Sequence, residues 1–81
     1  MQLSNVENGK SVRILYFHGG IWLEDKLRQL GLLPGSSARK LRQAPWGGPI
    51  MVEVDGRTIA IGKGIASKIY VEEERRECDS R

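Results

Sequence analysis

Glycine and proline interrupt this sequence so often that no secondary-structure element can be long. The chain has ten glycines and three prolines in 81 residues. They cluster at residues 19–20, 31–35, 45–49, 56 and 62–64. Glycine and proline end helices and interrupt strand ladders, so the segments between these clusters must be short. Five short strand-like segments in so small a chain predict a mainly β domain, either a barrel or a sandwich. We expect the sheet to close, because closure removes exposed strand edges.

The first strand is predicted over residues 10–17. Apolar side chains fall on both of its faces, which is typical of a strand covered on both sides. The predicted faces are Val12, Ile14 and Tyr16 on one side, with Leu15 and Phe17 on the other.

Four further strands follow from alternation and turn signals, over residues 36–44, 50–54, 57–61 and 69–71. Asp55-Gly56 predicts a two-residue type I′ hairpin between the third and fourth strands, because both central positions of that turn need a positive φ. Residues 65–68 can form a single helical turn before the last strand.

Residues 21–30 change to a helical period. Leu23, Leu27 and Leu30 lie at i, i+4 and i+7, which forms one apolar stripe on a short amphipathic helix. Gly31 follows as the expected left-handed cap, and Pro34 prevents the helix from resuming.

The length allows one domain, which we place at residues 10–71, after a lead-in over residues 1–9 and before a charged tail over residues 72–81. A lone cysteine, Cys78, cannot form an intramolecular disulfide, and this favours a reducing, cytoplasmic setting. We expect no signal peptide and no membrane span, because no apolar run approaches the roughly 18–20 residues that a span requires.

Several segments resemble the FeoA family. Residues 27–35, LRQLGLLPG, resemble the RL..LGL.PG signature of FeoA proteins. Residues 44–50, APWGGPI, resemble their AP.GGP loop. The hairpin at residues 52–61 and the closing segment at residues 66–71 match in order and spacing, so the similarity covers roughly residues 10–71.

The resemblance implies a five-stranded SH3-like barrel with one short helix and a one-turn helix before the last strand. It also implies an accessory role in ferrous iron uptake through protein–protein contact with FeoB, the membrane transporter with a cytoplasmic G-protein domain. The same fold unit occurs at the C-terminus of DtxR-type iron-dependent repressors. A metal-responsive regulatory module is therefore the alternative function.

The loop at residues 45–49 is our first choice for a partner-binding surface. Its prolines lower the entropy lost on binding, and Trp46 is a residue type enriched at interface hot spots. The alternative, in which Trp46 folds back as a lid on the barrel, remains open. The predicted contact residues are Trp46, Pro45, Gly47, Gly48 and Arg42, with Trp22 as a secondary contributor.

Trp22 and Ile21 lie one position off the apolar stripe of the helix. They could form an exposed patch for a partner, but we favour a structural plug between helix and barrel, since small domains recruit their large side chains for the core.

The sequence lacks the residues that a metal site, a nucleic-acid-binding surface, a phosphate-binding loop or a catalytic site would need. His18 and Cys78 are too few for a zinc site, so we interpret them as a turn residue and a tail thiol, and we expect no metal or cofactor. Lys40 and Arg42 are predicted to share one strand face, but that strand has no aromatic residue for base stacking, so we expect no nucleic-acid binding. The loop at residues 62–64 fails the phosphate-loop pattern, and no catalytic constellation is present, so we expect no enzyme.

Overall fold

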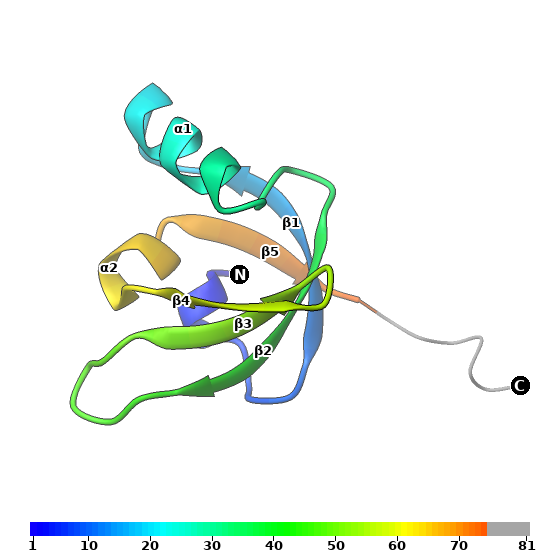
Figure 1. Ribbon diagram of the computed structural model, residues 1–81, viewed down its shortest axis with the longest axis vertical. Coiled ribbons are helices and arrows are strands. Elements are labelled where there is room, and N and C mark those ends of the chain that lie inside the picture. Colours follow the sequence, from blue (N-terminus) through cyan, green and yellow to red (C-terminus); the bar gives the residue numbers. More distant parts are fainter. Residues whose placement is uncertain (75–81) are drawn as a thin grey trace, which may run out of the picture.

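The computed structural model describes residues 1–74, and Cys78 with the rest of the predicted tail beyond Glu74 lies outside the described residues. The fold class is confirmed: within residues 1–74, five antiparallel strands with two short helices form one small β domain (Figure 1). The elements are a 3₁₀ turn η1 (Leu3–Asn5), β1 (Ser11–Phe17), α1 (Ile21–Gln29), β2 (Ser37–Gln43), β3 (Ile50–Val54), β4 (Arg57–Ile61), α2 (Lys63–Ala66) and β5 (Ile69–Glu73).

In the described part of the chain the sheet has the strand order β4-β3-β2-β1-β5 and does not close, so the prediction of closure is wrong. The outer edge of β5 is covered by the start of the chain instead of by β4. Gln2 forms a β-bridge with Tyr70, and the Val71 N–H donates to the Met1 carbonyl at 2.7 Å. A few residues of the lead-in thus protect one edge, and β4 is left as the other.

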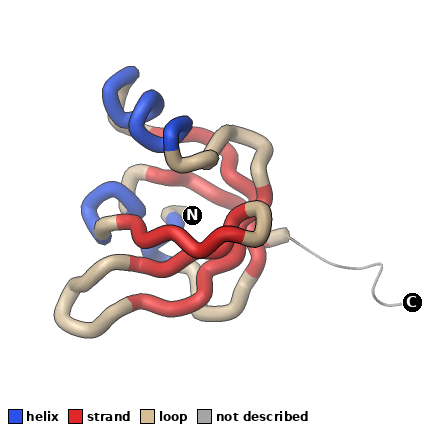
Figure 2. Tube along the Cα trace, in the orientation of Figure 1, coloured by secondary structure: helices blue, strands red, loops and turns tan. Residues whose placement is uncertain are grey.

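The curled sheet wraps a single core (Figure 2). The strands supply most of it, and α1 adds Leu23 and Leu27. The lead-in also enters the core, because Leu3 and Val6 are both buried. The buried apolar residues are Leu3, Val6, Val12, Ile14, Leu23, Leu27, Leu32, Ala38, Ile50, Val52, Val54, Ile61, Ala66, Ile69 and Val71.

A β-bulge in β1 changes which of its side chains face the core. The register with β5 pairs Ile14 with Val71 and Tyr16 with Tyr70, so Leu15 is an extra residue between them. An extra residue inverts the alternation beyond it. Tyr16 therefore points to solvent and is 53% exposed. The predicted faces are wrong after Ile14, and the strand is not covered on both sides.

A second bulge, at Leu41 in β2, separates Lys40 from Arg42. Lys40 pairs with Val52, whereas Arg42 pairs with the next residue back, Met51. Lys40 is consequently buried and Arg42 is exposed, so the prediction that the two share a face is wrong.

The end of α1 confirms the predicted cap. Gly31 has φ +89°, its N–H donates to the Arg28 carbonyl, and the Leu32 N–H donates to the Leu27 carbonyl at 2.9 Å. These are the two hydrogen bonds of a Schellman motif. The Asp55-Gly56 turn is also confirmed, with φ +52° and +78° at its two residues.

The last strand is longer than predicted. β5 continues to Glu73, and the Glu74 N–H donates to the Ser11 carbonyl at 2.9 Å. Glu73 pairs with Lys10 at 3.3 Å, so the first acidic residues of the predicted tail belong to the sheet.

Candidate partner-binding surface

The loop between β2 and β3 is a tight turn closed by its own backbone. The Ala44 N–H donates to the Pro49 carbonyl at 2.9 Å, and the Gly48 N–H donates to the Pro45 carbonyl at 3.2 Å. Trp46 and Gly47 occupy the central positions with φ +61° and +74°. Positive φ at both central residues defines a type I′-like turn, which is well suited to joining antiparallel strands.

Glycine is required at the last position of this turn for a steric reason. A Cβ on Gly48 would lie 2.7 Å from the Ala44 Cβ and 3.2 Å from the Pro45 carbonyl oxygen. The two glycines therefore make the turn possible, and the turn places Trp46 at its tip.

Trp46 contributes almost nothing to the packing of the fold. Its side chain is 97% exposed, so the interpretation of Trp46 as a lid on the barrel is wrong. Its left-handed backbone also costs about 1–2 kcal/mol, because Cβ approaches the following carbonyl. A large apolar ring held in solvent on a strained backbone has no stabilising role in the isolated domain.

We therefore expect Trp46→Gly to stabilise the domain. Glycine adopts φ +61° without the Cβ penalty, so the free energy of unfolding should rise by about 1 kcal/mol, measured by urea denaturation. Trp46→Ala is the matched control, because it removes the ring but keeps the Cβ. Equal stability of the two variants would show that the backbone at Trp46 is not strained.

The structure brings together most of the predicted contact residues, but not Trp22. Arg42 is exposed near the end of β2, on the strand that leads into the loop containing Pro45, Trp46, Gly47 and Gly48. Trp22 lies on α1, and Figure 1 shows α1 and the β2–β3 loop at opposite ends of the molecule. We call residues 44–49 together with Arg42 the Trp46 loop surface.

Trp22 and Ile21 form a second, separate apolar site at the start of α1. They are 71% and 75% exposed, so the favoured interpretation as a plug between helix and barrel is wrong. The exposure agrees with the alternative of an exposed patch, and binding of a partner there stays a prediction. Leu23 and Leu27 already fill the space under the helix, which leaves Ile21 and Trp22 on its solvent side. The Lys26 ammonium lies 6.0 Å from the Trp22 ring centroid.

A cleft beside α1 was not predicted. It has a volume of about 150 Å³ and is lined by Tyr16, Phe17, Glu24, Arg28, Leu33 and Pro34. Strict alternation along β1 places Tyr16 with the buried residues, so only the bulge at Leu15 reveals this cleft. The only sequence feature that points to the cleft is the pair of adjacent aromatic residues, Tyr16 and Phe17, at the end of that strand.

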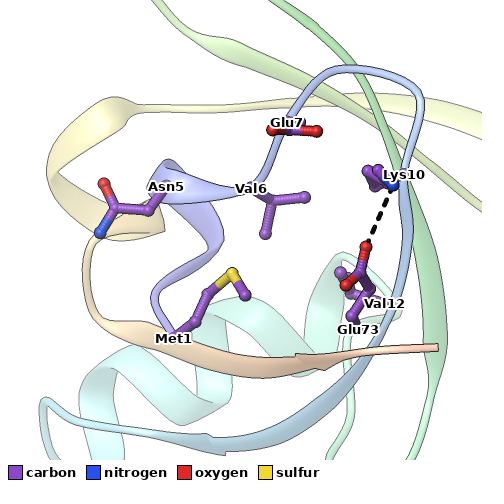
Figure 3. Close-up of a pocket in the computed structure, with 7 residues that line it drawn as sticks. All are labelled: Met1, Asn5, Val6, Glu7, Lys10, Val12 and Glu73. Carbon is purple, nitrogen blue, oxygen red and sulfur yellow. Dashed lines mark ion pairs between the residues drawn. The ribbon is translucent and has the colours of Figure 1, made fainter.

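A larger pocket of about 320 Å³ lies between the lead-in, the start of β1 and the end of β5 (Figure 3). Its apolar lining comes from Met1, Val6 and Val12, and the ion pair between Lys10 and Glu73 spans one side. Glu7 is its other carboxylate. The pocket thus combines a small apolar surface with charges that already partly neutralise one another.

Among residues 1–74, Lys40 is the one buried charged side chain, and its burial was not predicted from the sequence. It is 3% exposed, and its ammonium donates to the Val6 carbonyl at 2.6 Å and to the Ser4 carbonyl at 3.4 Å. Burial lowers the pKa of Lys40 from its usual value of 10.5, because removal from water disfavours the charged form. Lys40 therefore attaches the lead-in to the sheet and is not part of an open basic surface.

Within residues 1–74 no three His, Cys, Asp or Glu side chains lie close enough together to hold a metal ion. His18 lies in the bend after β1, as predicted, with its ring nearly perpendicular to that of Tyr70. No helix in the same residues is long and apolar enough to cross a membrane.

The architecture is that of the small SH3-like β domains. A crystal structure of an iron uptake regulatory protein (FeoA) superposes with a TM-score of 0.84 at 32% identity, over 91% of this chain and 96% of that one. The solution structure of FeoA from Chlorobium tepidum gives 0.84 at 28% identity, over 93% and 71% of the two chains. The ScaR protein with bound Zn²⁺ gives 0.84 at 27% identity, over 91% of this chain and 37% of its own.

The sequence comparisons agree with the structural ones. The FeoA domain family matches residues 1–73. A Methanocaldococcus jannaschii protein that carries the name Fe(2+) transport protein A is 31% identical over 71 residues, which is 88% of this chain and 84% of that protein. The chain belongs to the FeoA family, which is linked to ferrous iron transport.

Proposed function

We propose that this chain is a cytoplasmic accessory protein of ferrous iron uptake that binds the cytoplasmic G-protein domain of a FeoB-type transporter. Membership of the FeoA family supports the link to iron transport. The proposed mode of action is protein–protein contact without catalysis. The chain's role is then to present a rigid binding surface to the transporter.

The observation that supports this proposal most directly is the exposure of the Trp46 side chain. The ring is 97% exposed, and it stands on a turn that two backbone hydrogen bonds already close. Tryptophan is among the residues most enriched at interface hot spots, and a pre-formed turn loses little conformational entropy on binding. The contact residues are Trp46, Pro45, Gly47, Gly48 and Arg42, and Trp22 contributes at most a separate, secondary contact.

The direct test is the affinity of Trp46→Ala for the transporter's cytosolic domain, measured by calorimetry. A hot-spot tryptophan contributes about 2 kcal/mol or more, so we expect binding to weaken by roughly 30-fold. Trp22→Ala is the matched control, because it removes the same ring from another exposed position at the opposite end of the molecule. We expect it to change the affinity by less than about threefold.

Two results would remove the Trp46 loop surface from the proposal. One is unchanged affinity in Trp46→Ala, with the fold confirmed by circular dichroism. The other is an equal loss in both variants, which would indicate a non-specific contribution of exposed rings.

The structural likeness to the ScaR protein with bound Zn²⁺ favours one second candidate, a metal-responsive regulatory module. Calorimetry of the chain with ferrous iron or manganese separates the two functions. Stoichiometric binding at micromolar concentration would support metal sensing, and no heat of binding would support a pure protein–protein role. The absence of a three-ligand cluster in residues 1–74 is the reason that we place this candidate second.

A further inference from the structure

The two edges of the sheet differ in whether another segment of the chain covers them. The edge of β5 is covered, because Gln2 bridges Tyr70 and Met1 bonds to both backbone groups of Val71. The edge strand β4 has its backbone hydrogen bonds with β3 alone among residues 1–74. An uncovered edge presents unpaired N–H and C=O groups that can accept another strand.

The register of the β3–β4 hairpin identifies the free groups. Val54 and Arg57 flank the two-residue turn, so they form a hydrogen-bonded pair. Bonding alternates along an antiparallel strand, and therefore Arg57, Ile59 and Ile61 bond to β3. The backbone groups of Thr58 and Ala60 point outward.

Nothing in β4 blocks the approach of a second strand. The pairing with β3 is continuous, without a bulge, and β4 contains no proline. Thr58 and Ala60 are small and exposed. Ile59 lies on the core side but is only partly buried, so apolar surface continues up to the edge.

We propose that β4 pairs with β4 of a second copy of this chain, antiparallel and with the two-fold axis at Ile59. In this register Thr58 of each copy lies opposite Ala60 of the other, and all four outward groups on each strand become bonded. An axis at Thr58 or at Ala60 would bond only one residue pair within the strands. A shift by one residue would turn the apolar faces away from each other.

The charges of β4 are compatible with this self-pairing. Arg57 is the only charged residue of the strand, and it lies opposite Ile61 of the second copy, so no like charges meet. Ile59 meets Ile59 of the second copy on the core side, which extends the apolar cover of both molecules. The arrangement is isologous and closes on itself as a dimer. Two five-residue strands make a small interface, so we expect weak, concentration-dependent association.

A pair of charge variants tests the register directly. Thr58→Lys with Ala60→Lys places like charges opposite each other in the proposed dimer. Thr58→Lys with Ala60→Glu places a cation opposite an anion at the same positions. Both variants carry two substitutions at exposed sites, and circular dichroism checks that each remains folded.

The measurement is sedimentation velocity from about 10 μM to about 1 mM, the range in which a small interface associates. We expect the wild type to shift toward dimer as concentration rises and the like-charge variant to remain monomeric. The dimer dissociation constant of the opposite-charge variant should be at least about tenfold lower than that of the like-charge variant. A wild type that stays monomeric throughout would overturn the proposal. Equal association of both variants would place the dimer contact elsewhere.

Discussion

Leu27→Ala is expected to destabilise the domain by about 3 kcal/mol, which corresponds to a melting temperature roughly 10–20 °C lower for a chain of this size. Leu27 is fully buried and is one of only two buried side chains that α1 contributes to the core. Removal of its isobutyl group leaves a cavity that the neighbouring elements can fill only in part.

The loss at Leu27 also affects the way α1 ends. The Leu27 carbonyl accepts from the N–H groups of both Leu30 and Leu32, and Leu32 is itself fully buried in the same core cluster. A hydrophobic contact between these two positions typically accompanies a Schellman motif. We therefore expect α1 to loosen before the sheet unfolds, because its other anchors are Leu23 and the partly buried Leu30.

Thermal unfolding by circular dichroism, together with amide hydrogen exchange of α1, measures this effect. Arg28→Ala is the matched control, because it changes the next residue on the exposed face of the same helix, and we expect its cost to stay within about 0.5 kcal/mol. A similar small cost for Leu27→Ala would mean that α1 does not depend on the core for its position.

Much of the fold could be predicted because local patterns and tertiary packing agree. The leucine stripe and Gly31 defined α1 and its cap, and Asp55-Gly56 defined the hairpin with its turn conformation. In these segments the local backbone preference and the burial of the apolar face point to one structure. The resemblance to FeoA proteins added the SH3-like architecture and the link to iron transport.

The errors have two physical causes. The bulges at Leu15 and Leu41 each insert a residue that inverts the side-chain alternation, and periodicity alone gives no signal for them. They moved Tyr16 to the surface and separated Lys40 from Arg42. The second cause is long-range: the lead-in covers the outer edge of β5 and enters the core, and β4 is left as an open edge.

The candidate site was predicted in part for similar reasons. The composition of the Trp46 loop shows that it is a turn, but not whether its ring folds inward, because that depends on the space left by the rest of the core. The core residues and the lead-in already fill the space inside the curled sheet, so Trp46 and Trp22 remain outside it. Whether these exposed rings bind a partner stays a prediction.

Lys40→Ala is expected to cost about 3 kcal/mol at neutral pH. The substitution leaves the Val6 carbonyl, now bonded at 2.6 Å, without its buried donor, and it also removes buried methylene groups. Since Lys40 attaches the lead-in, the amides of Asn5 and Val6 should exchange faster with solvent. Lys40→Met is the matched control, because it retains most of the aliphatic packing and removes only the ammonium.

The pH dependence of the stability difference between the wild type and Lys40→Met separates the contribution of the Lys40 charge from that of its packing. Burial lowers the pKa of Lys40 in the folded state, whereas the unfolded chain keeps the usual value of 10.5. Between these two values the unfolded state binds more protons, so stability rises with pH in that window. We therefore expect the wild type to gain stability relative to Lys40→Met as pH increases toward 10.5, measured by urea denaturation. The cost of burying the charge is fully present at neutral pH and is relieved only when the ammonium loses its proton. A difference in unfolding free energy between the wild type and Lys40→Met that is the same at every pH would contradict this expectation. That result would show that the Lys40 ammonium is no less hydrated in the folded domain than in the unfolded chain.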